Sequence, residues 1–273
     1  MDLELPDGRV VRVHDGGGGG VPVFWLHGSP QTGDLLDPLL EAAFRRGIRL
    51  VGYDRPGYGG STALVGRDIG AAAADVGAIA DALGLERFAV AGHSGGGPHA
   101  LACGVLLPGR VSAVASLSGP APVSADGLDW FAHMAPGGEA ELRAAMAGRA
   151  VLEEHLASAE FDPEVFTPAD FAALEGPWAS LGANAEAAME AGLGGLVDDD
   201  LALVAPWGFD PARIAVPTLL VHGVRDRMVP SEHGEWMADA VRPHGELWLS
   251  PQDGHVSVLD RVGRVFDWLV GRS

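Results

Sequence analysis

The chain has 273 residues and a net charge of −19, and this length fits one large core or a core with one insertion. A charge this negative excludes nucleic acid and anionic membrane surfaces as expected partners, because both would repel the protein. The sequence contains no lysine and a single cysteine, Cys103, which excludes a lysine Schiff base, a P-loop and any internal disulfide.

The first 119 residues alternate short apolar runs with helical patterns, which predicts a mostly parallel α/β sheet flanked by helices. We expect strands at residues 9–14, 21–26, 48–53, 87–91 and 111–117. Helices are expected at residues 34–46 and 69–83, and the second of them ends at Gly84, a favourable residue for a helix C-terminus. Cys103 lies among small apolar residues and is expected to be a buried packing thiol.

Residues 120–212 interrupt this alternation and differ from the rest in composition. They hold seventeen acidic residues against two arginines. Thr167 and Pro168 are typical of a helix N-cap and of the first helical position. The α/β pattern then returns, with strands expected at 218–222 and 246–249 and helices at 232–241 and 258–269. We therefore expect an α/β core formed by residues 1–119 and 213–273, with an inserted helical cap at 120–212.

Residues 92–96 read Gly-His-Ser-Gly-Gly, which matches the G-x-S-x-G pattern of a nucleophile elbow. The pattern follows a predicted strand and precedes a helix, and this is the context that the motif requires. A serine on such a sharp turn needs glycine neighbours, because side chains there would clash. Ser94 is therefore the candidate nucleophile.

A serine hydroxyl is a weak nucleophile and needs a base, together with an acid that orients the base. His255 lies between the last predicted strand and the last predicted helix, at the sheet edge where ligands meet open α/β sheets. Asp226 follows the penultimate strand by a short turn, so the chain order is Ser94, Asp226, His255. Asp253 is the competing acid, but a neighbour two residues away rarely reaches Nδ1 of the same imidazole.

An oxyanion that forms during the reaction needs two hydrogen-bond donors. The backbone N–H of Gly95, directly after the nucleophile, is one candidate. The second should come from the loop after an early strand, where residues 27–30 read His-Gly-Ser-Pro, and we assign it to the backbone N–H of Ser29. We expect the His27 side chain to brace this loop.

These motifs, in this order, resemble the α/β-hydrolase superfamily. The resemblance covers residues 21–119 and 213–273, and it rests on the segments 27–30, 54–61 (Asp-Arg-Pro-Gly-Tyr-Gly-Gly-Ser), 92–98, 222–230 and 254–255. It implies an α/β-hydrolase fold with an esterase-like serine nucleophile, and a mainly architectural role for the loop at 54–61. The cap shows no such match, so the resemblance leaves the choice of substrate open.

The resemblance also implies an activity. A serine at position 94 argues against members with an aspartate nucleophile, such as haloalkane dehalogenases and epoxide hydrolases. Similar members with a serine nucleophile include carboxylesterases, thioesterases, carbon–carbon bond hydrolases, lactonases and cofactor-free perhydrolases. Ester hydrolysis is the least demanding reaction that these members share, so we expect a carboxylesterase-like serine hydrolase that cleaves a small-molecule carboxylic ester, or a related acyl bond, through an acyl-enzyme. One alternative is an aminopeptidase of the proline iminopeptidase type. Another is a non-hydrolytic member of the fold, either a receptor or a cofactor-free catalyst.

The cap contributes the candidates for substrate binding. Trp130, Phe131 and Met134 follow soonest after the strand at 111–117 and are our candidates for an apolar pocket. Family peptidases hold the ammonium group of the substrate with cap carboxylates, and residues 153–154 or 198–200 would be available for this role. We favour a solvated acidic surface instead, because charge runs usually face water.

No segment of the chain has the composition of a signal peptide or of a membrane span. Residues 1–20 carry charges and glycines where a signal peptide needs an apolar stretch. No apolar run approaches the roughly 20 residues that cross a bilayer. We expect a cytoplasmic enzyme with a small-molecule substrate, no cofactor, no metal, and neither nucleic acid nor membrane as partner.

Overall fold

The computed structural model describes residues 1–273 and contains one eight-stranded sheet in the order β1-β2-β4-β3-β5-β6-β7-β8. The last six strands in this order run parallel, whereas β1 and β2 pair antiparallel at one edge. The strands are β1 (Asp2–Glu4), β2 (Val10–Asp15), β3 (Val21–Leu26), β4 (Ile48–Tyr53), β5 (Phe88–His93), β6 (Val111–Leu117), β7 (Thr218–Gly223) and β8 (Gly245–Ser250). The predicted mostly parallel α/β sheet is confirmed.

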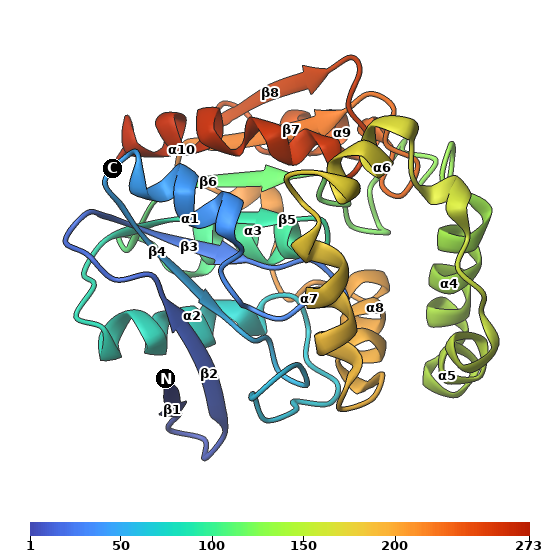
Figure 1. Cartoon of the computed structure of the whole chain (residues 1–273), viewed down its shortest axis with the longest axis horizontal. Coiled ribbons are helices and arrows are strands. Elements are labelled where there is room, and N and C mark those ends of the chain that lie inside the picture. Colours follow the sequence, from blue (N-terminus) through green and yellow to red (C-terminus); the bar gives the residue numbers. More distant parts are fainter.

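Helices cover both faces of this sheet (Figure 1). The helices of the core are α1 (Asp37–Phe44), α2 (Ala71–Ala82), α3 (Gly96–Leu106), α9 (Ser231–Ala240) and α10 (Val262–Val270). Helices α1 and α10 pack together on one face, and α2 and α3 pack together on the other. Strands β5 and β6 are buried along their whole length, because helices lie over both of their faces.

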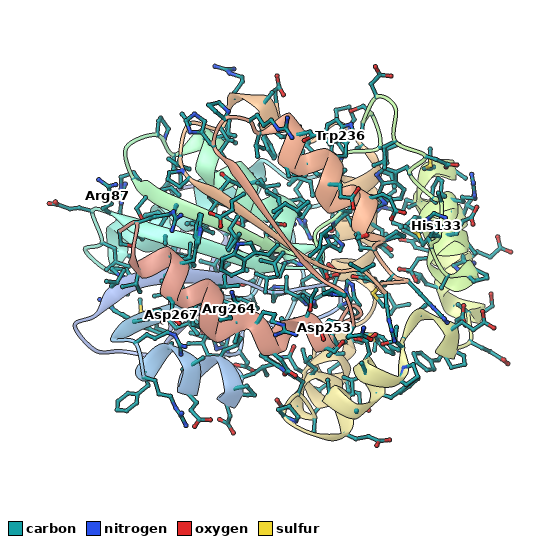
Figure 2. All side chains as sticks on the ribbon, turned by 90° about the horizontal axis from the view of Figure 1, so that it is seen from above. Arg87, His133, Trp236, Asp253, Arg264 and Asp267 are labelled. Atoms are coloured by element: carbon teal, nitrogen blue, oxygen red, sulfur yellow. The ribbon has the colours of Figure 1, made fainter.

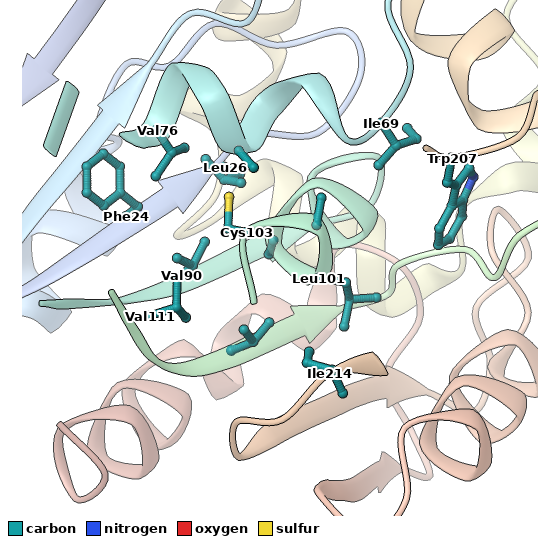
Figure 3. Close-up of a cluster of buried hydrophobic side chains, with 14 of the residues drawn as sticks. Phe24, Leu26, Ile69, Val76, Val90, Leu101, Cys103, Val111, Trp207 and Ile214 are labelled. Atoms are coloured by element: carbon teal, nitrogen blue, oxygen red, sulfur yellow. The ribbon is translucent and has the colours of Figure 1, made fainter. Parts of the chain in front are cut away.

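Each central strand contributes to two hydrophobic cores, because successive side chains point to opposite faces of a sheet. In β5, Val90 belongs to the core under α2 and α3, whereas Ala89 and Ala91 belong to the core under α1 and α10. Figure 3 shows the first of these cores, in which Cys103 of α3 lies close to Leu26 of β3. Cys103 is fully buried, so its predicted packing role is confirmed.

The chain between β6 and β7 forms the helical cap. Its helices are α4 (Pro136–Ala147), α5 (Arg149–Ser158), α6 (Pro168–Glu175), α7 (Ser180–Met189) and α8 (Gly194–Val204), with 3-10 turns η1 (Pro163–Val165) and η2 (Pro211–Arg213). Figure 2 shows Arg87, just before β5, at the end of the molecule opposite the cap, and His133 at the cap end. The carboxyl ends of the parallel strands therefore face the cap. The inserted cap is confirmed, while the boundaries at 119/120 and 212/213 stay a prediction.

The structure differs from the expected pattern in several elements. The helix expected at residues 258–269 is divided into a 3-10 turn, η3 (Ser257–Arg261), and α10. The division lies where Asp170 of the cap accepts hydrogen bonds from the Val256 and Ser257 amides, so a side chain outside the helix fixes its first turn. Strand β1 and helices α7 and α8 were not predicted, and α8 contains three consecutive aspartates, which are weak helix formers.

None of the helices is both long enough and apolar enough to span a bilayer.

Candidate active site

Ser94 lies on the sharp turn between β5 and α3. Its φ is +53°, a left-handed conformation that is uncommon for residues other than glycine. Close packing of backbone explains the neighbouring glycines: a Cβ on Gly92 would lie 2.1 Å from the carbonyl oxygen of Gly96, and a Cβ on Gly96 would lie 2.0 Å from that of Leu26. The turn thus has the geometry of a nucleophile elbow, and it places a half-buried serine at the start of a helix.

Asp226 and His255 follow strands β7 and β8, and they meet at the carboxyl end of the sheet. Nδ1 of His255 lies 2.8 Å from Oδ2 of Asp226, and both side chains are buried. The other carboxylate oxygen, Oδ1, accepts hydrogen bonds of 2.9 Å from the amides of Met228 and Val229. These two amides orient the carboxylate. Because a carboxylate can only accept a hydrogen bond, the proton of the neutral imidazole lies on Nδ1, and Nε2 is left as the acceptor.

This buried pair shifts the titration of both partners. Burial lowers the pKa of His255, but the charge and the hydrogen bond of Asp226 outweigh it, so the pKa is raised from its ordinary value of 6.5. Burial raises the pKa of Asp226, but the charge and the hydrogen bond of His255 outweigh it, so this pKa is lowered. Asp226 is therefore a carboxylate at neutral pH, and it stabilises the protonated form of His255.

Asp253, the competing acid, is engaged elsewhere. Its Oδ2 accepts a hydrogen bond of 3.0 Å from Nε of Arg261 and another from the hydroxyl of Ser250. Figure 2 shows Asp253 beside the end of the C-terminal helix that lies nearer to the cap. Asp226 is thus the carboxylate that contacts the His255 ring.

Ser94 and His255 line one cavity of about 780 Å³, whose wall contains residues of both the core and the cap. The side-chain hydrogen bond of His255 is the one from Nδ1 to Asp226, and Nε2 has no partner within the protein. The hydroxyl of Ser94 is not hydrogen-bonded to the ring in this conformation. Both groups are therefore available to a substrate in the cavity and to each other.

The two candidate oxyanion donors also line this cavity and lie side by side. A Cβ on Gly95 would lie 2.7 Å from Oγ and 3.8 Å from the backbone nitrogen of Ser29. Neither amide donates a hydrogen bond to the backbone. His27 braces the loop as expected, because Nδ1–H donates to the carbonyl oxygen of Gly28 at 2.7 Å and Nε2 accepts from the amide of Arg55 at 3.0 Å.

A buried charge cluster holds the loop at residues 27–30 against the cap. Asp199, in α8, accepts hydrogen bonds from the Ser29 hydroxyl, from Tyr58 at 2.8 Å, and from Arg55 and Arg67 at 2.6 Å each. Arg55 also donates to Oγ of Ser29 at 3.0 Å. Burial raises the pKa of Asp199, but Arg55 and Arg67 outweigh it and hold this pKa well below the ordinary range. This role of Asp199 could not be predicted from the sequence, because an aspartate within an acidic run has no local sign of burial.

Replacing Asp199 by alanine is expected to lower the free energy of unfolding by about 3–5 kcal/mol, because Arg55 and Arg67 would remain buried without a counter-charge. Urea unfolding at neutral pH measures this loss. The matched control is Asp198→Ala in the same helix, whose partner Arg149 is 35% exposed and can turn to water. Equal losses in the two variants would contradict the assignment.

A second cap aspartate holds the loop that carries His255. Oδ1 of Asp170, in α6, accepts hydrogen bonds of 2.8 Å from the amides of Val256 and Ser257, while Oδ2 accepts from the amide of Thr167 at 2.9 Å. Asp170 is fully buried and also caps its own helix. The N-cap signal at 167–170 predicted the helix but not its contact with the loop of His255.

His93, directly before Ser94, contacts the loop of His255 and was not among the predicted site residues. Its Nε2–H donates a hydrogen bond of 2.9 Å to the carbonyl oxygen of His255. Burial and the charge of His255 lower the pKa of His93 to about 3, so the ring is neutral, with its one proton on Nε2 and Nδ1 left as an acceptor. Its position inside the G-x-S-x-G motif was the one available signal.

The candidates for the apolar pocket separate into two groups. Trp130 and Met134 line the cavity, and the indole N–H of Trp130 donates a hydrogen bond of 2.7 Å to the carbonyl oxygen of Ala121. Phe131 does not line the cavity, because its ring packs under the guanidinium group of Arg143, 4.1 Å from the ring centre. Adjacent residues in this turn point in different directions, so proximity in sequence was misleading for Phe131.

The expectation of a solvated acidic surface holds for one of the two acidic runs. Glu153 and Glu154 are exposed. It is wrong for Asp198, Asp199 and Asp200, which are 3%, 1% and 3% exposed. Of these three, Asp200 lines the cavity that holds Ser94. No group of three or more histidine, cysteine or carboxylate side chains is arranged to hold a metal ion.

Comparisons with known proteins agree with this fold. A family model described as alpha/beta hydrolase fold matches residues 21–262. A non-heme chloroperoxidase of Streptomyces lividans is 30% identical over 269 residues, covering 85% of this chain and 88% of that protein. A solved esterase from Exiguobacterium antarcticum has a TM-score of 0.71 at 24% identity and covers 99% of this chain and 98% of its own. An enol-lactonase from Burkholderia xenovorans LB400 has a TM-score of 0.73 at 20% identity, with coverages of 99% and 98%.

Proposed function

Since the chain belongs to the α/β-hydrolase fold family, we propose that it is a serine hydrolase that cleaves a small-molecule carboxylic ester. One observation carries this proposal. The serine of the elbow, an imidazole oriented by a buried carboxylate and two free backbone amides all belong to one cavity. The hydroxyl, the imidazole, the carboxylate and the pair of amides are the four components that acyl transfer through a serine ester needs from the protein.

In the proposed first half-reaction, Oγ of Ser94 attacks the ester carbonyl while Nε2 of His255 takes the hydroxyl proton. The carbonyl oxygen becomes an oxyanion, which accepts hydrogen bonds from the amides of Ser29 and Gly95. As the tetrahedral intermediate collapses, the bond to the alcohol oxygen breaks, and the imidazolium gives its proton to that oxygen. The products of this half are the free alcohol and an acyl ester on Ser94.

In the second half-reaction, water replaces the alcohol. Nε2 of His255 takes a proton from water, and the resulting hydroxide attacks the acyl carbonyl. Collapse returns the proton to Oγ of Ser94 and releases the carboxylic acid. Two structural neighbours are an esterase and an enol-lactonase, which supports an ester or lactone as the bond cleaved. The size of the cavity supports a small molecule.

A fluorophosphonate that mimics the ester carbonyl is expected to label Ser94 covalently, because the probe needs an activated serine. Mass spectrometry of peptides from the labelled protein locates the adduct. Protein unfolded in urea before labelling is the control, since the probe should not react without the assembled site. An adduct on another serine of the folded protein would contradict the assignment.

The activity is expected to depend on one ionisation at the acid side of the pH range. The base form of His255 is the neutral ring, and Asp226 raises the pKa of this ring above 6.5. Because protonation removes the base, kcat/KM should rise with pH through a midpoint above 6.5 and stay level beyond it. A pH–rate profile on a neutral ester measures this midpoint, and a midpoint below 6.5 would contradict the pairing of His255 with Asp226.

A further inference from the structure

The chain on both sides of His255 is fixed by one carboxylate of the cap, that of Asp170. Oδ1 of Asp170 accepts hydrogen bonds of 2.8 Å from the amides of Val256 and Ser257 and one of 2.9 Å from the Ser257 hydroxyl. This hydroxyl in turn accepts a hydrogen bond of 2.8 Å from the amide of Gly254. The backbone is therefore tied to Asp170 both before and after the imidazole.

The same carboxylate explains the glycine that precedes His255. A Cβ on Gly254 would lie 2.1 Å from Oδ2 of Asp170, so a larger residue would displace the carboxylate. Oδ2 accepts hydrogen bonds from the Thr167 amide at 2.9 Å and from its hydroxyl at 2.8 Å. Burial raises the pKa of Asp170, but the hydrogen bonds from Ser257 and Thr167 outweigh it and lower this pKa. Asp170 is thus a buried carboxylate at neutral pH.

The negative charge of Asp170 has no positive partner in the resting protein. Its donors are all neutral groups, and no arginine or histidine forms an ion pair with it. On the other sides of the His255 ring lie Asp226, at 2.8 Å, and His93, with ring centres 4.9 Å apart. His222 lies 3.8 Å from Asp226, and burial lowers the pKa of both neighbouring histidines, so they are neutral. Two carboxylates therefore act on one imidazole.

We propose that Asp170 is a positioning residue through which the cap both places His255 and stabilises its protonated form during the reaction. This inference rests on the proposed ester hydrolysis. When Nε2 of His255 takes the proton of Ser94, the ring becomes positive near two negative charges. The charge of Asp170 then gains a partner that it lacks in the resting protein. An interaction that is stronger in the transition state than in the ground state lowers the barrier.

Replacing Asp170 by asparagine tests this role, because the substitution removes the charge and keeps the shape. For a neutral ester, kcat at the plateau of the pH profile should fall about tenfold or more, since the ring is less well placed and its protonated form loses a charge nearby. KM should stay within about twofold, because Asp170 does not line the cavity. Burial lowers the pKa of His255, while the charges of Asp226 and Asp170 raise it, so the midpoint of the profile should move to lower pH.

Three further variants separate charge, position and stability. Glu175→Gln is the matched control, because Glu175 is an exposed carboxylate of the same helix without an ion pair, and it should leave kcat, KM and the pH midpoint unchanged. Thr167→Val removes the hydroxyl that caps α6, so it should lower the midpoint of urea unfolding and leave the pH midpoint in place. Ser257→Ala keeps the charge but breaks the link to the Gly254 amide, so kcat should fall about tenfold without a shift to lower pH.

An NMR titration of the His255 ring measures its pKa without turnover, and the resonance is identified by its absence from His255→Gln. A pKa in Asp170→Asn equal to that of the wild type overturns the proposal, as does an equal shift in Thr167→Val. A wild-type kcat in Ser257→Ala also overturns it, and this result decides if Asp170→Asn does not fold. A wild-type protein that hydrolyses no ester would instead count against the proposed function, while the titration would still report on Asp170.

Discussion

Replacing Ser94 by alanine is expected to lower kcat for a neutral ester by about 10⁶-fold, the order of loss that follows when a serine nucleophile is removed from this mechanism. The acyl-enzyme cannot form without Oγ, and the remaining rate reflects water attack assisted by the oxyanion amides and by binding. The substitution removes one half-buried hydroxyl that makes no hydrogen bond, so the free energy of unfolding should change little.

The measurement for Ser94→Ala is a steady-state assay with enough enzyme to detect residual turnover, together with urea unfolding. Ser112→Ala is the control, because that buried serine of β6 donates to the carbonyl oxygen of Phe88 and does not line the cavity. It should retain kcat within about threefold, since substitutions away from a site rarely alter the barrier by 1 kcal/mol. A kcat for Ser94→Ala within about 100-fold of wild type would contradict the nucleophile assignment.

Replacing Asp226 by asparagine is expected to lower kcat by about 10⁴-fold at neutral pH, because the proton of the neutral His255 ring moves from Nδ1 to Nε2. Oδ1 of Asp226 accepts hydrogen bonds from the Met228 and Val229 amides, so the amide oxygen of asparagine will occupy that position. Its NH₂ group then faces Nδ1 of His255 and donates to it. The ring must carry its own proton on Nε2, and it can no longer accept the proton of Ser94.

The pH profile distinguishes this tautomer effect from loss of structure. Asp226 raises the pKa of His255, and without its charge burial dominates, so the pKa of the ring should fall in Asp226→Asn. The control Asp253→Asn removes the other nearby carboxylate, whose partners are Arg261 and Ser250, and should retain a kcat within about tenfold of wild type. If Asp253→Asn caused the larger loss, the roles of the two acids would be reversed.

The turn that carries Ser94 could be predicted from sequence because its signals are local. A strand, a glycine on each side of Ser94 and a helix follow one another within residues 88–106, and steric clash alone accounts for the glycines. Asp226 and His255 required a different signal, their positions after the last two parallel strands. Because parallel strands deliver their carboxyl ends to one edge, chain order was enough to bring the two residues together.

The contacts between cap and core could not be predicted in this way. Ser29 and Asp199 are 170 positions apart, and Asp170 and Val256 are 86 positions apart. Whether an aspartate is buried with arginines or exposed to water depends on the packing of helices, which its neighbours in sequence do not encode. For the same reason Trp130 and Phe131, adjacent in the chain, face different surroundings.

The two cap aspartates have a consequence for how this enzyme can be altered. Asp199 and Asp170 are fully buried, and each bonds to a loop that the site depends on. A chimera that exchanges the whole cap for that of a relative would disconnect both loops, so it would lose turnover as well as its original selectivity. Grafts that keep α6 and α8 and exchange α4 and α5 leave these attachments in place. Exchange of these two whole helices is therefore a way to change the substrate range that leaves both aspartates in place.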